Sequence, residues 1–517
     1  MEINRNITMN QVTWFVVMLL GFVLAVFMGS AVGSADFSIV SIVLGAGIGM
    51  ATFTILGKNY WMLLPLSLSG SNLPALPLAG RNIEFGELAV AGCSLIFIVR
   101  LALRRETLKL WRPASLPILF FMSWVIMVFI QNPSGLAFLG SATGGARFYI
   151  KLLLAFFAFV ILSTRTYTQR DIRMIFGLLL AGGALSLINS VLSVILVGPA
   201  LDPVTGLIRD NSYTWHQELS IPAFALTTLL FARWSPKELF SLKHAWLVLA
   251  FVGCVATVLI SGKRLMMATI FLPMMVSAIL WKQFVAIFIG ITIAVALFAA
   301  LVAGHGTLFE LPIVAQRAIS WLPGDWAPEL QNIAGGADDW RAELRFLAFE
   351  QLKRRPIVGT GFSVDISETT TAYLAAERGG DMNIQVAAYA LGRAWHNVWY
   401  GYAADFGIPL SIAQGVLFLV ICIISARVFR AYTNVSLLGT YGMFVFIYTV
   451  REIIGSYTGG HSAMDAYQNW WMYGVLISIY YGLPKHTHNE HTNSTDTQTQ
   501  EGLRTNRHRG LQAAGGH

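Results

Sequence analysis

Charged residues, cysteines and metal-ligand patterns are all scarce in this sequence. Charged residues make up only 12% of the chain, against about a quarter in soluble domains, which argues against a water-soluble fold. The three cysteines, Cys93, Cys254 and Cys422, all lie in apolar runs, and we interpret them as small buried hydrophobic residues. No Cys/His spacing resembles a zinc site, so the sequence predicts neither a metal nor another cofactor.

What the sequence has in abundance is apolar surface. Apolar residues make up 56% of the chain, and the mean hydropathy is +0.62. A membrane-spanning helix needs roughly 20 apolar residues, and the chain supplies a dozen or more such runs. We therefore expect an all-α polytopic membrane protein of about 12–14 transmembrane helices. The excess of positive charge, +8, falls mostly in short loops and gives no indication of a nucleic-acid partner.

The basic loops set the expected topology. The most basic short loop, Arg104–Arg112, is placed in the cytoplasm. Alternating the spans from there places nearly all of the remaining basic loops inside and one long polar stretch outside. The expected spans cover about 12–32, 37–56, 87–103, 116–130, 148–162, 175–197, 221–231, 245–260, 265–280, 284–302, 408–424, 437–448 and 470–483. The first of these is interpreted as a retained span, not a signal peptide.

One stretch leaves two alternatives open. Tyr60–Ala79 is uncharged but contains Pro65, Pro74 and Pro77, so it could span the membrane or form a broken re-entrant segment. Spanning is favoured here, which would place both chain termini in the cytoplasm. The re-entrant alternative would place the N-terminus outside.

Four regions follow from this pattern. We expect an N-terminal transmembrane bundle at 1–303, a large extracytoplasmic loop with short helices at 304–395, C-terminal transmembrane helices at 396–484 and a disordered cytoplasmic tail at 485–517. A loop of that length is usually functional or disordered. Because this one carries tryptophans, paired carboxylates and several arginines, we interpret it as a catalytic cap.

Cations on the outer side need a reason, because topology disfavours them there. Lys263 and Arg264 occupy the tight connection between two spans. Their side chains could reach lipid phosphates, or Arg264 could hold two oxygens of an anionic substrate. Arg209 could pair with Asp202 or Asp210. Arg147 and Lys151, one helical turn apart, could contact lipid headgroups or the same substrate.

Two further candidates flank the loop itself. The pattern from Trp340 to Leu352 predicts a helix capped by Asp338 or Asp339, with Arg341 in its first turn. His396 follows the loop, and Asn397 could orient its ring. A histidine here can be structural, but its ordinary pKa near 6.5 also suits a general base. The pair Arg451–Glu452 is read as a salt bridge on the outer side.

Three motifs in this order resemble those of the O-antigen ligase and polymerase superfamily of bacterial envelope enzymes. Ser261–Arg264 resembles the Ser-x-x-Arg hairpin of that family. The stretch Trp340–Phe362 resembles its arginine-bearing helix followed by Pro-x-x-Gly-x-Gly, and His396–Leu410 resembles its His-Asn motif with Gly-Ile-Pro. The sequence departs from the pattern at Lys263 and Arg345, and the match near Arg209 is loose.

The resemblance implies a GT-C-like, metal-independent inverting glycosyltransferase in the bacterial inner membrane, with its active site facing the periplasm. The donor would be a glycan on undecaprenyl diphosphate, and the acceptor a sugar hydroxyl of a lipid A core or a growing polysaccharide. Arg264, Arg341 and Arg209 would hold the diphosphate, and His396 would accept the proton. Ligase and polymerase remain alternatives, as do a flippase of an anionic lipid-linked glycan and a non-catalytic scaffold.

Overall fold

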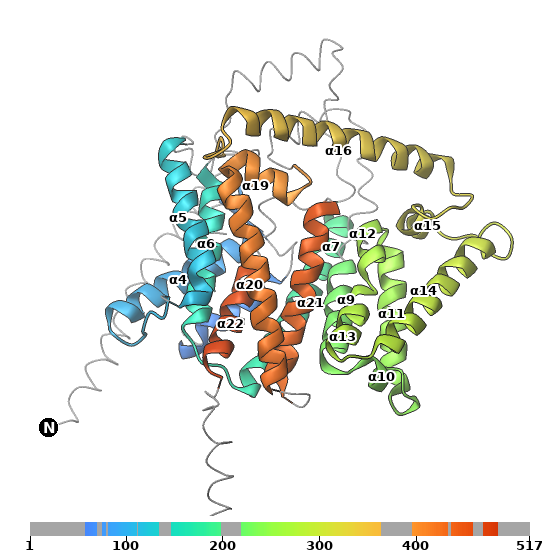
Figure 1. Cartoon of the computed structure of the whole chain (residues 1–517), viewed down its shortest axis with the longest axis horizontal. Helices are drawn as coiled ribbons and strands as arrows, with labels where there is room; N and C mark the ends of the chain where they lie inside the picture. Colours follow the sequence, from blue (N-terminus) through green and yellow to red (C-terminus); the bar gives the residue numbers. More distant parts are fainter. Residues whose placement is uncertain are drawn as a thin grey trace, which may run out of the picture. The chain divides into compact units, whose positions relative to one another are not determined.

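The computed structural model describes residues 57–69, 75–78, 81–110, 112–133, 146–197, 219–362, 395–432, 436–458 and 469–483. The chain divides into two compact units, Met1–Tyr480 and Tyr481–His517. Nearly all described residues belong to the first unit, which is built from helices and one short hairpin (Figure 1). The first two expected spans lie outside the described residues.

Long apolar helices dominate the first unit. Six segments of the described chain are long and apolar enough to cross a membrane, namely Phe85–Ala102, Pro113–Gln131, Gln169–Asn189, Phe284–Gly304, Ile408–Tyr432 and Leu437–Tyr457. Shorter apolar helices cover Ser220–Arg233, Ala245–Ser261 and Arg264–Leu280. This is the pattern of an all-α protein embedded in a membrane.

Most helices begin and end close to where the apolar runs do. The described helices are α3 (Leu63–Leu68), α4 (Phe85–Ala102), α5 (Leu116–Gln131), α6 (Ala146–Ser163), α7 (Gln169–Val197), α9 (Ser220–Arg233), α10 (Pro236–Leu239), α11 (Ala245–Ser261), α12 (Arg264–Thr269), α13 (Leu272–Leu280), α14 (Phe284–Gly304), α15 (Ile313–Ile319), α16 (Pro328–Arg354), α19 (Val398–Phe406), α20 (Ile408–Tyr432), α21 (Leu437–Thr458) and α22 (Trp470–Tyr481). The expected span 265–280 is divided into α12 and α13, with Pro273 in the first turn of α13.

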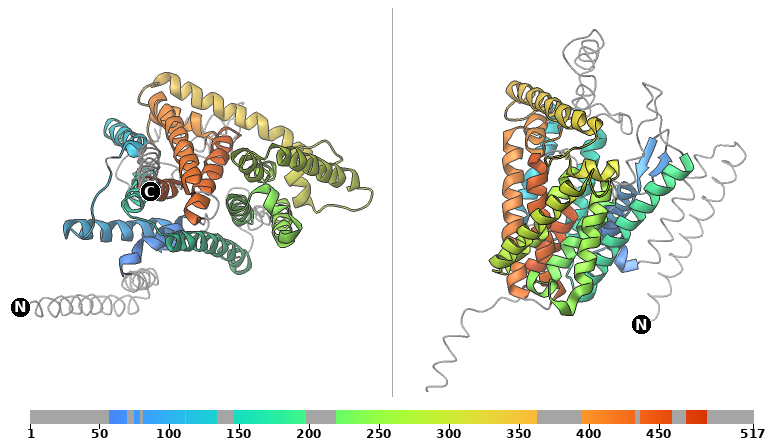
Figure 2. Two further views of the ribbon diagram at one scale, coloured as in Figure 1. Left: turned by 60° about the horizontal axis from the view of Figure 1, so that its bottom comes forward. Right: turned by 90° about the vertical axis from the view of Figure 1, so that its right-hand side faces the viewer.

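The helices α20 and α21 form a hairpin that packs against several other helices of the bundle. These helices pack against each other, and α21 also packs against α7 and α9 (Figures 1 and 2). Large aromatic side chains fill the interior, among them Phe121, Tyr402, Phe444 and Trp470, each essentially inaccessible to solvent. Phe121 makes edge-to-face contacts with both Tyr402 and Trp470. The helix α21 is therefore surrounded by the bundle along most of its length.

The stretch Tyr60–Ala79 does not form a spanning helix, so the favoured expectation is wrong. A 3-10 helix (Gly57–Met62) and the six-residue α3 are followed by strand β1 (Ala75–Leu78). This strand pairs antiparallel with β2 (Arg81–Glu84), with Ala75 opposite Glu84. The prolines explain the difference, because proline interrupts the hydrogen bonding of a helix. Proline is tolerated in an edge strand, and both strands of this two-stranded ribbon are edges.

The long loop after α14 is also more regular than expected. It contains the seven-residue α15 and the 27-residue α16. The helix α16 begins at Pro328, with proline in its first turn, and not near Asp338. Arg341 therefore lies in the middle of the helix and not in its first turn. Lys353 and Arg354 occupy the last turn, where cations are favoured by the helix dipole.

A cluster of aromatic and charged side chains ties the ends of α4 and α6 to the 3-10 helix. Glu106 lies 3.1 Å from Arg100 Nε and 3.7 Å from Arg165 Nη1. The Arg165 guanidinium also lies over the rings of Tyr60 and Trp61. Burial, with a smaller contribution from Glu106, raises the pKa of Tyr60 to about 12. This cluster fixes one of the basic loops that are expected in the cytoplasm.

Candidate functional site

His396 is held in an unusual backbone conformation between two anchored neighbours. Its φ is +50°, in the left-handed region, which few residues other than glycine adopt. Trp395 donates a hydrogen bond from Nε1 to the carboxylate of the buried Asp405, at 3.2 Å from each oxygen. The His396 ring is half-buried, and the contacts of its neighbours hold its backbone in this conformation. Backbone conformations of this uncommon kind cluster at functional sites.

Asn397 anchors the other side of His396. Its Oδ1 accepts a hydrogen bond from the backbone N–H of Tyr400 at 3.1 Å and so caps α19. Its Nδ2 donates to the backbone carbonyl of Tyr457 on α21 at 3.3 Å. Asn397 therefore fixes the start of α19 against the end of α21, and its orienting of the His396 ring stays a prediction.

The Pro-x-x-Gly-x-Gly segment interlocks with the junction of α19 and α20. The backbone N–H groups of Thr360 and Gly361 donate to the carbonyls of Ala404 and Asp405, at 3.2 and 2.6 Å. Gly359 has φ +69°, and a Cβ there would lie 2.4 Å from the Asp405 carbonyl oxygen. A glycine is required here for both its conformation and its size.

Gly407 makes the reciprocal contact from the other side of this junction. Its φ is +84°, and a Cβ would lie 1.8 Å from the carbonyl oxygen of Ile357. The N–H of Ile408 also donates to the carbonyl of Pro356 at 2.9 Å. Two of the three motifs that the sequence singles out thus form one packed unit.

Arg341 lies on the face of α16 that packs toward this unit. Leu347 and Ala348 contact Trp395 and Ala404, and Ala348 is buried. Arg341 precedes Ala348 by seven residues, which is two helical turns or about 10 Å along the same face. The structure therefore brings the helix of Arg341 and the helix that follows His396 together, and the Arg341 side chain is half-buried.

Arg264 and Lys263 lie on the other side of α21, where α15 packs on α11 and α12. Arg264 Nε donates to the backbone carbonyl of Arg317 on α15 at 3.3 Å. Both side chains are half-buried, so the hairpin is covered by the first helix of the long loop. Contact with α15 accounts for the position of Arg264 better than a side chain extended into lipid.

Arg147 and Lys151 are engaged by carboxylates of α4. Arg147 Nη2 lies 3.1 Å from Glu87 Oε2, and Lys151 Nζ lies 2.7 Å from Glu84 Oε1. Glu84 and Glu87 together form the capping box at the start of α4. Contact of these two cations with lipid headgroups or with a diphosphate stays a prediction. Both cations serve the contact between α4 and α6, and the site that we propose below does not include them.

One candidate cannot be placed. Arg209 lies outside the described residues, as does the part of the long loop from 363 to 394. Within the described chain, no group of three His, Cys, Asp or Glu side chains lies close enough to hold a metal ion.

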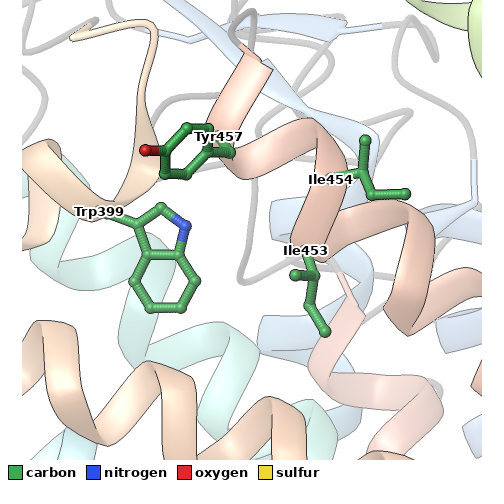
Figure 3. A pocket seen from close by; sticks show the side chains of 4 residues that line it. All are labelled: Trp399, Ile453, Ile454 and Tyr457. Carbon is green, nitrogen blue, oxygen red and sulfur yellow. The ribbon is translucent and has the colours of Figure 1, made fainter.

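An apolar pocket of about 530 Å³ opens beside Asn397. Trp399 of α19 and Ile453, Ile454 and Tyr457 of α21 line it (Figure 3). The Trp399 ring faces the two isoleucines across the pocket, and Tyr457 lies at one edge. Because Asn397 binds the carbonyl of Tyr457, the pocket lies next to the His396 segment.

The structure adds residues that the sequence did not identify as part of a site. Asp405 is completely buried and positions Trp395 beside His396. Arg451 and Glu452 form the expected salt bridge, but both are buried within α21 and not exposed in a loop. The adjacent opposite charges were a visible signal, whereas nothing in the sequence marked Asp405.

No protein-family model matches the chain, and no curated protein matches it.

Proposed function

We propose that the protein is a membrane glycosyltransferase that moves a glycan from an undecaprenyl-diphosphate carrier to a hydroxyl acceptor. The observation that carries the proposal is the packed unit around His396, in which a left-handed histidine is clamped between Trp395–Asp405 and Asn397. The arginine-bearing α16 packs on the same unit. Residues held in sparsely populated backbone conformations cluster at functional sites, which supports a functional role for His396.

The side of the membrane follows from the direction of α20 and α21. Arg427 and Arg430 lie near the end of α20 that leads into α21, and a basic end is expected in the cytoplasm. The start of α20 and the end of α21, where Asn397 binds Tyr457, would then face the periplasm of a bacterial inner membrane. We propose this orientation for the site, together with a GT-C-like architecture of about 12–14 spans.

The chemistry is a single displacement at the anomeric carbon. His396 would take the proton from the acceptor hydroxyl, whose oxygen attacks the anomeric carbon. The bond from that carbon to the phosphate oxygen breaks, and the electron pair leaves with the diphosphate. Arg264 and Arg341, with Arg209 if it lies nearby, would stabilise this charge, each at the scale of a few kcal/mol. General-base help adds about 10²–10⁴-fold.

The apolar pocket suits the lipid part of such a donor. Its four lining side chains are aromatic or branched aliphatic, and it adjoins the His396 segment. We propose that it receives the first isoprenoid units of the carrier. This would place the diphosphate close to the residues that bind it.

The direct test is transfer from a purified lipid-linked donor by the full-length protein in liposomes. We expect His396→Ala to lower the rate by about 10²–10⁴-fold while the protein inserts normally. His244→Ala is the matched control, because the His244 ring in a short connecting helix bonds Ser241 and the Glu238 carbonyl, which are local contacts. Normal transfer by His396→Ala would eliminate this mechanism.

The arginines offer a second test on one helix. Arg341→Ala should raise the KM for the donor and lower kcat, whereas Arg345→Ala, whose side chain is exposed, should leave both unchanged. An equal effect of the two changes would contradict the role of Arg341.

Excess chelator should not change the rate. Surface-glycan gels after gene deletion would distinguish a ligase, which leaves glycan on its carrier, from a polymerase, which leaves single repeat units.

A transporter of an anionic lipid-linked glycan is the second candidate. Glu452 favours it, because a buried carboxylate within a membrane helix is typical of proton-coupled transport. Flux of a labelled lipid-linked glycan into liposomes, without transfer to an acceptor, would support this function. Transfer without flux would support the glycosyltransferase.

A further inference from the structure

The pair Arg451–Glu452 lies inside the membrane bundle without an evident structural need. Arg451 and Glu452 are 6% and 5% exposed, and their side chains are paired. Removing two charges from water is costly even when they pair, and a well-packed apolar pair is often as stable. Ionisable residues in membrane helices usually mark functional sites. The pair therefore calls for an explanation beyond stability.

The guanidinium of Arg451 has more donors than the described residues use. One Nη donates to Glu452, and the other lies 3.6 Å from the sulfur of Met266, a weak acceptor. The rings of Phe224 and Tyr448 lie 5.2 and 5.8 Å from its central carbon. The buried Nε has no hydrogen-bond partner among the described residues. A buried N–H without a partner is energetically costly, and an anion would supply a strong acceptor for it.

The location of Arg451 connects the two sides of the candidate site. Met266 belongs to α12, two residues beyond Arg264. Six residues along α21, about 9 Å by helical rise, the carbonyl of Tyr457 binds Asn397 beside His396. Arg451 thus lies on the helix that contacts both the Arg264 hairpin and the His396 segment.

We propose that Arg451 is an anion-binding residue of this site and takes a phosphate group of a diphosphate ligand. Glu452 holds the guanidinium while the site is empty and gives it up to the ligand, so that Glu452 competes with the anion. The choice of a diphosphate rests on the proposed function. Arginine suits this exchange because its planar fork accepts a carboxylate or a phosphate in the same geometry.

This proposal predicts opposite signs for two neighbouring substitutions. Arg451→Gln removes charge-assisted hydrogen bonds and should weaken diphosphate binding by about tenfold or more. Glu452→Gln removes the competing carboxylate and should strengthen binding by a few fold. A purely structural pair predicts something different, because both changes would then lower stability and neither would strengthen binding.

The experiment measures the dissociation constants of inorganic diphosphate and farnesyl diphosphate for the full-length protein in detergent. Binding of both probes would show that the headgroup is recognised by itself, and binding of farnesyl diphosphate alone would show that the lipid is also required. Glu452→Gln tightening the binding, with Arg451→Gln weakening it, supports the proposal. Unchanged dissociation constants in both variants, within about twofold, would overturn it.

Two further variants cover the case in which a single neutralisation prevents folding. Arg451→Lys keeps the ion pair but loses the fork, so binding should weaken by a few fold. The double variant Arg451→Gln/Glu452→Gln leaves no unpaired buried charge and should bind as weakly as Arg451→Gln. Wild-type binding by these two variants would equally overturn the proposal. If the wild type binds diphosphate but transfers no glycan, the proposed function fails while this inference stands.

Discussion

Two groups of charged residues in the membrane bundle differ in how completely their cations are paired. At the contact of α4 and α6, Arg147 and Lys151 share two carboxylates, Glu84 and Glu87, which also cap a helix. Within α21, Arg451 pairs with Glu452, and its Nε has no hydrogen-bond partner among the residues that the structure describes. Aromatic rings and a thioether also lie beside its guanidinium. The first group is partly exposed and the second is buried. The comparison suggests a criterion for choosing ligand candidates among cations in the bundle. A cation is the better candidate when the carboxylates of the protein do not accept hydrogen bonds from all of its N–H groups.

The largest difference in stability between the two groups should come from their carboxylates. Glu452→Ala leaves Arg451 buried without a counter-charge, so we expect the free energy of unfolding to fall by about 3–5 kcal/mol. Glu87→Ala should lower it by about 1 kcal/mol, because Glu84 remains for both cations. Unfolding in mixed detergent micelles measures both. Equal losses would show that burial does not distinguish the two groups.

Removal of a third carboxylate, that of Asp405, should lower the free energy of unfolding by an amount between these two values. Asp405 is buried and accepts the Trp395 indole N–H, so Asp405→Ala leaves that donor unsatisfied. We expect the free energy of unfolding to fall by about 2–3 kcal/mol. Under the proposed function, the displaced His396 should also lower the rate of glycan transfer. Asp325→Ala, at an exposed position, is the control for stability in the same unfolding assay. An Asp405→Ala protein as stable as the control would mean that Asp405 does not position Trp395.

Among these charged residues, Arg147 of the partly exposed group should contribute least to the free energy of unfolding. Arg147→Gln should lower the free energy of unfolding by less than about 1 kcal/mol, because its side chain and that of Glu84 are 23% and 48% exposed. The loss should shrink further between about 0.05 M and about 1 M salt. The contribution of the buried Arg451 should not change with salt. The same dependence at both positions would contradict the comparison.

The smallest effect is expected at Tyr60, which has a buried hydroxyl with no hydrogen-bond partner among the described residues. At pH 7 Tyr60→Phe should leave the melting temperature nearly unchanged. The folded-state pKa of Tyr60 is raised to about 12 from an ordinary value near 10. The wild type should therefore lose stability as the pH rises from about 10 toward 12. Thermal melts across this range should show a smaller loss for Tyr60→Phe.

Apolar periodicity predicted the helices whose ends coincide with a change in composition. The start and end of α5, α11 and α14 agree with the expected spans to within a residue or two. The prediction ended α21 ten residues early, at Tyr448, because Arg451 and Glu452 resemble a loop. Hydropathy treats each charge as exposed, whereas these two neutralise each other inside the bundle.

Contacts between distant segments were the part that the sequence could not supply. The order of the motifs placed His396 and Asn397 at the end of the long loop. Only the fold shows that Asp405 holds Trp395, and that α15 covers Arg264. The start of α16 was misplaced because Asp338 resembles a cap, while Pro328 provides the actual start. Local signals mark where a helix can begin, and packing selects among them.

The close approach of Gly359 and Gly407 to backbone atoms has a consequence for how such a protein can diversify. The short strap from Arg355 to Phe362 cannot gain or lose a residue without separating α16 from α19. Insertions are therefore easier to accommodate in the segment between α15 and α16 than in this strap. A single glycine inserted after Gly359 should disrupt the contact between α16 and α19, whereas one inserted after Gly324 in the exposed segment before α16 should be tolerated.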